Sequence, residues 1–409
     1  MTTINKKKIL IISLNIPYPL AHGGAIAQYY FLKNLSIYHD ITFCSFAENE
    51  DELQNLTILA RKIPDIKIIY HYKRNNYSDG PFIDFLRNIY FKFRQKRVNR
   101  DSNHSISSVL KLIDSEFVTF LVKHLEQNSY DIFQLEFFET LSLVAILPPS
   151  SKKIFINHEI LSRNLGLSNP DVSNKQNQAY IVPTIRAVER IFLNSFNKIV
   201  VFSEEDKIYL KNLDPDILTS PFGIPDELIT RTTSSEKFTR FVFLGSELHQ
   251  ANKEGLKWFL DHVYVPNNSN IDWPLFISGI WSKDFREEYK ENPKIIFTGF
   301  VSDLNPLFDE SILINPIISG SGIRTKILQA FVNMVPVLST AQGCEGLLHE
   351  FSSNQHLLQF SNEKDFLQIF EMIKNNNTYL RKVIENAHQF YHSNFATSSV
   401  LSKRNEAYF

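Results

Sequence analysis

The stretch from Ser311 to Phe331 constrains the fold of this chain more than any other. It begins with an apolar run, Ser311–Ile314, that is typical of a buried strand, and continues into a loop of Gly320, Ser321 and Gly322. The stretch therefore predicts a buried strand, a small-residue loop and a helix in direct succession. The helix is indicated by apolar residues at the spacing of one helix face, namely Ile323, Ile327, Leu328 and Phe331.

A helix that begins directly after such a loop is well suited to binding an anion. Its first amide groups have no partners within the helix and carry the positive end of the helix dipole. Glycines allow a diphosphate to approach those amides closely. Acidic side chains are normally favoured in a first turn, yet this sequence places Arg324 and Lys326 there. These cations indicate a bound anion; the alternative is an ordinary amphipathic helix with a solvated face.

Three neighbouring motifs together resemble the donor-site signature of the family-4 glycosyltransferases. Gly-Ser-Gly-Ile-Arg-Thr-Lys-Ile-Leu-Gln-Ala starts at Gly320, Val-Pro-Val-Leu-Ser-Thr ends at Thr340, and Gly-Cys-Glu-Gly-Leu ends at Leu347. Each motif alone would be a weak signal, but their combination is specific. The resemblance implies a retaining enzyme with the GT-B fold, an α/β fold in which two Rossmann-like domains face a cleft.

Length and composition favour two domains. The chain has 409 residues, of which 43% are hydrophobic and 21% charged, so it can bury large cores. In the first half, short apolar runs alternate with helical patterns, which predicts a parallel sheet with helices on both faces. These runs are Ile9–Ser13, Ile41–Phe46, Ile66–Tyr70, Ile132–Leu135, Ile154–Ile156 and Ile199–Phe202.

The expected organisation has four segments. Residues 1–222 form an acceptor-side Rossmann-like domain, 223–239 a linker, 240–390 a donor-binding domain and 391–409 a terminal helix. The linker is placed where the sequence after Asp226 becomes polar and weakly patterned. The resemblance further implies that the terminal helix returns to the first domain.

Charge and cysteine content bear on partners and compartment. The net charge is −1, so the chain carries no overall electrostatic footprint for nucleic acid. Cys44 and Cys344 lack metal-binding or redox spacing, which fits a reducing cytoplasm. The apolar run Ile9–Ile12 is too short for a signal peptide, and no run approaches the roughly 20 residues that cross a bilayer. We expect a cytoplasmic protein.

Residues 82–100 read as a helix with an apolar aromatic stripe and a basic end. Phe82, Phe85 and Phe93 belong to the stripe, and four basic residues follow it up to Arg100. Such a helix can lie on an anionic membrane surface, here the inner membrane face. The alternative is a helix packed on the first domain with a solvated basic end.

In the first domain, the loops after the strands carry the candidate site residues, because ligands of parallel sheets bind at the carboxyl ends of strands. The first loop lacks the Gly-x-Gly-x-x-Gly fingerprint, which weighs against a nicotinamide dehydrogenase. Its Gly23 and Gly24 open a helix and resemble the family's loop between donor and acceptor; the alternative is an ordinary helix start. His158 follows a strand and would bind the sugar or assist deprotonation of the acceptor, with Glu159 as a weaker candidate acid or base.

In the second domain, the resemblance implies how a nucleotide diphosphate-sugar is held. Arg324 and Lys326, together with the amides of the loop before them, would stabilise the leaving diphosphate without a metal or other cofactor. Phe300 and Val301 would contact the base, and Lys253 could reach a phosphate. The implied donor-binding set is Gly245, Ser246, Lys253, Phe300, Val301, Gly320, Ser321, Gly322, Ile323, Gln329 and Glu345.

Several positions depart from the family pattern. Gln329 stands where the family usually has a glutamate that binds the ribose, and Ser246 and Gln250 stand where many members have an arginine and a lysine. A neutral hydrogen bond in place of a charged one would weaken donor binding by about tenfold. The leading hypothesis is transfer of a hexose to a glycan or lipid-linked saccharide. The alternatives are a non-catalytic sugar- or nucleotide-binding subunit and a nucleotide-sugar epimerase.

Overall fold

A computed structural model describes residues 6–73, 113–167, 175–320, 322–347, 351–375 and 377–409. The expected membrane-surface helix at 82–100 and the loop residue Ser321 lie outside these residues. The backbone contacts divide the chain into two compact units. The first comprises residues 1–19, 35–200 and 212–217, and the second comprises 20–34, 201–211 and 218–409.

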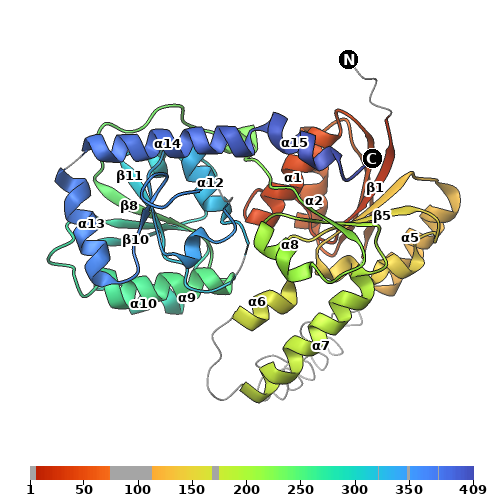
Figure 1. Cartoon of the computed structure of the whole chain (residues 1–409), viewed down its shortest axis with the longest axis horizontal. Helices are drawn as coiled ribbons and strands as arrows, with labels where there is room; N and C mark the ends of the chain where they lie inside the picture. The colour runs from red at the N-terminus through yellow and green to blue at the C-terminus, as the bar shows by residue number, and fades with distance from the viewer. Residues whose placement is uncertain (1–5, 74–112, 168–174, 321, 348–350, 376) are drawn as a thin grey trace, which may run out of the picture. The chain divides into compact units, whose positions relative to one another are not determined.

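The strands of the first half form one sheet, of which Figure 1 labels β1 and β5. The strand order is β3-β2-β1-β4-β5-β6-β7. β1 pairs in parallel with β2 on one side and with β4 on the other, so the strand order reverses between β1 and β4. All six apolar runs named above form strands; β7 was not predicted, because it is short and only partly apolar. The strands are β1 (Lys8–Ile12), β2 (Asp40–Ala47), β3 (Lys67–Tyr72), β4 (Ile132–Glu136), β5 (Lys152–Ile156), β6 (Lys198–Val201) and β7 (Asp216–Thr219).

The helices of the first half begin and end where local chemistry favours it. In α2, the Asn49 side chain accepts a hydrogen bond from the Glu52 amide, acidic residues occupy the first turn, and basic residues occupy the last. Leu56 and Leu59 of this helix are buried. The helical segments are α1 (Gly23–Leu35), α2 (Glu50–Lys62), α5 (Ser115–Gln127), η1 (Phe138–Ile146), α6 (Leu161–Leu167), α7 (Lys175–Leu193) and α8 (Glu204–Leu210).

The second sheet has the order β10-β9-β8-β11-β12-β13, and all of its defined strand pairs are parallel. Its order reverses between β8 and β11. The core of this domain combines aliphatic and aromatic side chains, and Phe241 and Phe243 of β8 are fully buried in it. The strands are β8 (Arg240–Leu244), β9 (Leu275–Ser278), β10 (Ile295–Gly299), β11 (Ser311–Asn315), β12 (Val337–Ser339) and β13 (Leu358–Gln359).

The chain ends in two helices, and the last of them packs within the second unit against α1. Arg404 of α15 is fully buried, with its guanidinium 3.6 Å from the centre of the Phe31 ring of α1. In the described part of the chain, no helix is long and apolar enough to cross a membrane. The helical segments are η3 (Asp226–Leu228), α9 (Gln250–Phe259), η4 (Leu260–Tyr264), α10 (Lys283–Glu288), α11 (Asn305–Phe308), α12 (Thr325–Val332), η5 (Gln342–Cys344), α13 (Glu363–Asn375), α14 (Asn377–Phe395) and α15 (Thr397–Asn405).

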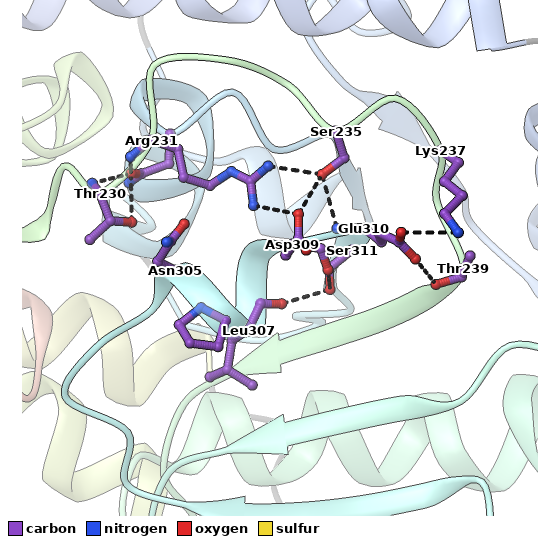
Figure 2. A network of polar contacts seen from close by, with 12 residues as sticks. Thr230, Arg231, Ser235, Lys237, Thr239, Asn305, Leu307, Asp309, Glu310 and Ser311 are labelled. Atoms are coloured by element: carbon purple, nitrogen blue, oxygen red, sulfur yellow. Dashed lines mark hydrogen bonds and ion pairs between the residues drawn. The ribbon is translucent and has the colours of Figure 1, made fainter.

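The polar segment expected as a linker is held firmly on the second sheet. Figure 2 shows the Arg231 guanidinium between Asp309 Oδ1 (3.0 Å) and Ser235 Oγ (2.9 Å). Asn333, at the end of α12, accepts hydrogen bonds from the backbone amides of Thr230 and Arg231 and donates to the Leu228 carbonyl. The segment therefore follows a defined path beside α12.

We predict that Asn333→Ala destabilises the second domain. Asn333 is fully buried, and alanine would remove its bonds to Thr230, Arg231 and Leu228 at once. Leaving buried backbone groups without partners costs about 2–4 kcal/mol in total. The shift of the urea unfolding midpoint measures this loss. Asn270→Ala, at an exposed position of the same unit, is the control. An equally small shift in both variants would contradict the claim that Asn333 holds the 228–231 segment in place.

Candidate active site

The strand ends of the second sheet bring the predicted donor-binding residues to one edge. Because the strands run parallel, the loops after β8, β9, β10, β11 and β12 all leave the sheet at its carboxyl edge. The loops after β8 and β11 are neighbours at the point where the strand order reverses. Parallel α/β sheets bind their ligands at such a switch point.

Helix α9 packs very closely against the loop after β11. A Cβ atom at Gly255 would lie 2.6 Å from the Pro316 carbonyl oxygen, so only glycine permits this approach. Glu254, one residue earlier, accepts a hydrogen bond of 2.5 Å from Ser319 Oγ. The two elements that flank the switch point are therefore in direct backbone contact.

The loop before α12 folds back on itself around Arg324. The Arg324 guanidinium donates from Nη2 to the carbonyl oxygens of Ser319 (3.2 Å) and Gly320 (2.9 Å), and the residue is only 8% exposed. The prediction that Arg324 lies in the first turn of the helix is wrong, because α12 begins at Thr325 and Arg324 precedes it. The reason is the extended backbone of Arg324, with φ −83° and ψ 93°. Lys326 is in the first turn.

The first and third sequence motifs come together at this loop. Gly346, from the third motif, has φ +82°, and a Cβ there would lie 2.8 Å from the Ile323 amide nitrogen. Gln342 donates to the Gly320 carbonyl at 2.8 Å and also contacts the Glu345 carboxylate. The loop after β12 therefore supports the loop that carries Gly320, Gly322 and Ile323.

Lys326 occupies the centre of the switch point. Its Nζ donates to Asn252 Oδ1 at 2.8 Å and lies 4.3 Å from the centre of the Phe243 ring. Loss of hydration, with a smaller contribution from the charge of Arg324, lowers the pKa of Lys326 to about 7. The site thus contains a cation that titrates near neutral pH.

Two of the remaining predicted donor residues on this side already have partners within the loop after β8. The Lys253 ammonium forms an ion pair of 2.7 Å with Glu247, and this pair lowers the pKa of Glu247 to about 2. Ser246 Oγ accepts a hydrogen bond from the Ile280 amide at 3.1 Å. Gly245 lies beneath Asn252, whose Nδ2 donates to the Ser246 carbonyl. Ser246 and Lys253 therefore shape this loop.

Large apolar side chains stand exposed on the same strand-end loops. Phe300, just after β10, is 53% exposed, and Val301 is partly buried beside it. Gln329 is buried on α12, the helix that begins directly after the glycine-containing loop. The exposed apolar residues on these loops are Leu248, Ile280, Phe300 and Ile318.

The first sheet places His158 in a buried pair that involves an unpredicted residue. Glu136 ends β4 and lies in register with Ile156 of β5, two residues before His158. The His158 Nε2 is 2.8 Å from Glu136 Oε2, and the two side chains are 5% and 4% exposed. Gln134 Nε2 donates to the other carboxylate oxygen at 2.6 Å. Glu136 is thus held from both sides.

Phe137 packs against the His158 member of this pair. Its ring stacks on the His158 ring, with centroids 3.8 Å apart and planes 8° from parallel. Its backbone has φ 68° and ψ 151°, a conformation that costs a residue other than glycine about 1–3 kcal/mol. Strain of this kind persists only where the surrounding contacts enforce it.

The other first-half candidates lie elsewhere. Glu159 is exposed and accepts a hydrogen bond from Asn164 Nδ2 at 3.0 Å, so it does not join His158 in the buried pair. Gly23 and Gly24 open α1, which belongs to the second unit. Within that unit, a Cβ at Gly23 would lie 2.5 Å from Thr325 Oγ1, at the start of α12.

Sequence reasoning missed Glu136, Asn252 as the partner of Lys326, and His249. Glu136 carried a signal, since a carboxylate that closes an apolar strand faces the ligand edge of a parallel sheet. His249 precedes α9, and loss of hydration together with the charges of Lys326 and Arg324 lowers its pKa. Among the described residues, no group of three or more His, Cys, Asp or Glu side chains is arranged to hold a metal ion.

We predict that Lys326→Met stabilises the protein most strongly at low pH. The pKa of Lys326 is near 7 in the folded protein and near 10.4 in the unfolded chain, so folding disfavours its charged form. The resulting penalty is fully present below pH 7 and disappears as the pH rises toward 10.4. Urea unfolding at pH 6 and pH 9 should show the larger gain at pH 6. A gain independent of pH would contradict the assignment, and the ion-paired Lys253→Met is the control.

Comparison with known proteins agrees with this geometry. Residues 239–373 match the family model of the glycosyl transferases group 1. An "uncharacterized 44.6 kDa protein in cps region" of Klebsiella pneumoniae is 21% identical over 97% of this chain and 98% of its own length.

Solved structures share the fold over nearly the whole chain. Sucrose-phosphate synthase from Thermosynechococcus elongatus superposes with a TM-score of 0.69 at 13% identity, covering 98% of both chains. Anabaena HepE in complex with UDP and glucose gives a TM-score of 0.67 at 12% identity, covering 98% of this chain and 99% of its own. With residues 239–373 forming a group 1 glycosyl transferase domain, the chain is a glycosyltransferase of the GT-B fold.

Proposed function

We propose that this enzyme transfers a hexose, with retention of configuration, from a nucleotide diphosphate-sugar to a glycan or a lipid-linked saccharide. The observation that carries the proposal is the position of Lys326. A cation that is largely buried, a loop with two glycines and the start of α12 meet where the strand order of the second sheet reverses. A diphosphate is the ligand that this combination fits best.

The chemical task of the site is to stabilise the diphosphate as it leaves the sugar. Fixed donors aimed at the developing charge are each worth roughly a hundredfold to a thousandfold in rate. We assign this task to Lys326 and to the amides of Gly322 and Ile323, with no metal or other cofactor. Arg324 adds positive charge and holds the loop through the carbonyls of Ser319 and Gly320.

The base and ribose would be held on either side of the diphosphate. Phe300 offers an exposed ring just after β10, and Val301 offers the backbone beside it. Gln329, buried on α12, would hydrogen-bond the ribose through a neutral amide. HepE was solved with UDP and glucose, which makes UDP the first nucleotide to test.

The acceptor would be bound near the strand ends of the first sheet, where His158 lies. A relative of similar length comes from a cps region, which fits a role in polysaccharide synthesis. We place the enzyme in the cytoplasm. Cys44 and Cys344 are both free thiols, as expected in a reducing compartment.

We expect UDP or another nucleoside diphosphate to bind with micromolar affinity and Arg324→Ala to weaken that binding at least a hundredfold. The substitution removes positive charge and the bonds that hold the loop. Isothermal titration calorimetry measures binding, and release of nucleotide from the donor measures transfer. Arg286→Ala, on the exposed helix α10, should behave as wild type. Full transfer activity in folded Arg324→Ala would refute the proposed site.

Binding of the diphosphate should also be accompanied by uptake of a proton. With a pKa of about 7, Lys326 is mostly neutral at pH 8 in the free enzyme, and an adjacent diphosphate raises its pKa. Calorimetry at pH 8 in buffers of different ionisation enthalpy should therefore show uptake of up to one proton. Lys326→Met should abolish it. Binding without any proton uptake would exclude contact between Lys326 and the diphosphate.

A further inference from the structure

We propose that Glu136 is a positioning residue that fixes the tautomer of His158, with the proton on Nε2 and the acceptor lone pair on Nδ1. The His158 Nε2 lies 2.8 Å from Glu136 Oε2, inside the first unit. An ionised carboxylate only accepts hydrogen bonds, so this contact requires a proton on Nε2. In the neutral ring, Nδ1 is then the acceptor.

The other contacts of Glu136 leave it little freedom to turn away. Gln134 Nε2 donates to Oε1 at 2.6 Å, so the two carboxylate oxygens have distinct partners. The register of β4 and β5 places Glu136 opposite Ile156, the last residue of β5, and His158 follows two residues later in the loop. The pairing is therefore built into the backbone of two adjacent strands.

Phe137 restrains the ring from a second direction. Its stacking on His158 at 3.8 Å covers one face of the imidazole, and its backbone holds a strained conformation that the surrounding contacts must enforce. The charge contact fixes which nitrogen is protonated, while the stacking fixes the plane of the ring. Together they define which atom of His158 a hydroxyl group can use.

The consequence for the reaction rests on the proposed function. The Nδ1 atom of His158 is buried in the structure. A sugar hydroxyl that reaches His158 would have to donate to this nitrogen, because Nε2 is committed to Glu136. Glu136 itself would not touch the sugar and would act only through His158. The effect of losing Glu136 should therefore depend on whether His158 is present.

Glu136→Gln tests the tautomer directly. Gln134 donates toward Oε1, so the amide oxygen of the new side chain is expected to take that place and its NH₂ group to face His158. His158 Nε2 must then accept, and the proton moves to Nδ1. Nitrogen-15 NMR of histidine-labelled protein distinguishes the two tautomers, with His158→Gln used to assign the signal.

The expected NMR result is an Nε2-protonated His158 in the wild type and an Nδ1-protonated His158 in Glu136→Gln. Glu159→Gln, at the exposed neighbouring carboxylate, should leave the wild-type signal unchanged. An Nδ1-protonated wild type, or an unchanged signal in Glu136→Gln, would overturn the proposal. These spectra need no sugar donor, so they decide the tautomer separately from the transferase reaction.

A double-mutant cycle tests the effect on transfer. Glu136→Ala should lower kcat roughly ten- to a hundredfold in the wild-type background, with a smaller change in KM. The same substitution in His158→Ala should have almost no further effect. Equal effects in both backgrounds would show that Glu136 acts independently of His158 and overturn the positioning role. Circular dichroism and unfolding midpoints identify a variant that fails to fold.

Discussion

The donor site depends on the backbone contact between helix α9 and the loop after β11. Gly255 brings the helix within direct contact of Pro316, a distance that any Cβ would increase. That closeness lets Asn252, three residues earlier on α9, reach Lys326 of α12 at 2.8 Å. It also leaves Lys326 over the Phe243 ring of β8. One glycine thus sets the spacing of the helix, the loop and the cation at the switch point of the sheet.

The electrostatics of this arrangement favour an incoming anion. The contacts of Lys326 with Asn252 and with the Phe243 ring are not ionic, and Arg324 beside it repels its charge. Burying a charge without full compensation is unfavourable, which is why the pKa of Lys326 falls. A diphosphate would supply the missing negative charge. Lys253 differs from Lys326, because the Glu247 carboxylate already neutralises its charge. The sequence resemblance alone therefore overstates how readily Lys253 could bind a phosphate.

The sequence predicted the parts of the structure that follow from local patterns. Apolar runs placed the strands correctly, and the strand, glycine loop and helix order located the cation site, since all of these depend on neighbours in the chain. Contacts between distant segments were not predictable. The pairing of Glu136 with His158 depends on β4 lying beside β5, and that of Asn252 with Lys326 depends on β8 lying beside β11. No spacing in the sequence encodes either adjacency.

In both sheets, contacts between segments at or after the ends of adjacent parallel strands build the candidate site, but the chemistry differs. In the first sheet, the register of β4 and β5 brings Glu136 close to His158. In the second sheet, the helices that follow the adjacent strands β8 and β11 bring Asn252 to Lys326. In the second sheet the result is a cation beside a glycine-containing loop, suited to a ligand that brings its own charge. In the first sheet the carboxylate is built in, the imidazole is stacked, and the backbone of Phe137 is strained. Rigid placement of His158 makes sense where a hydroxyl must be oriented, because small errors in position lower the rate steeply.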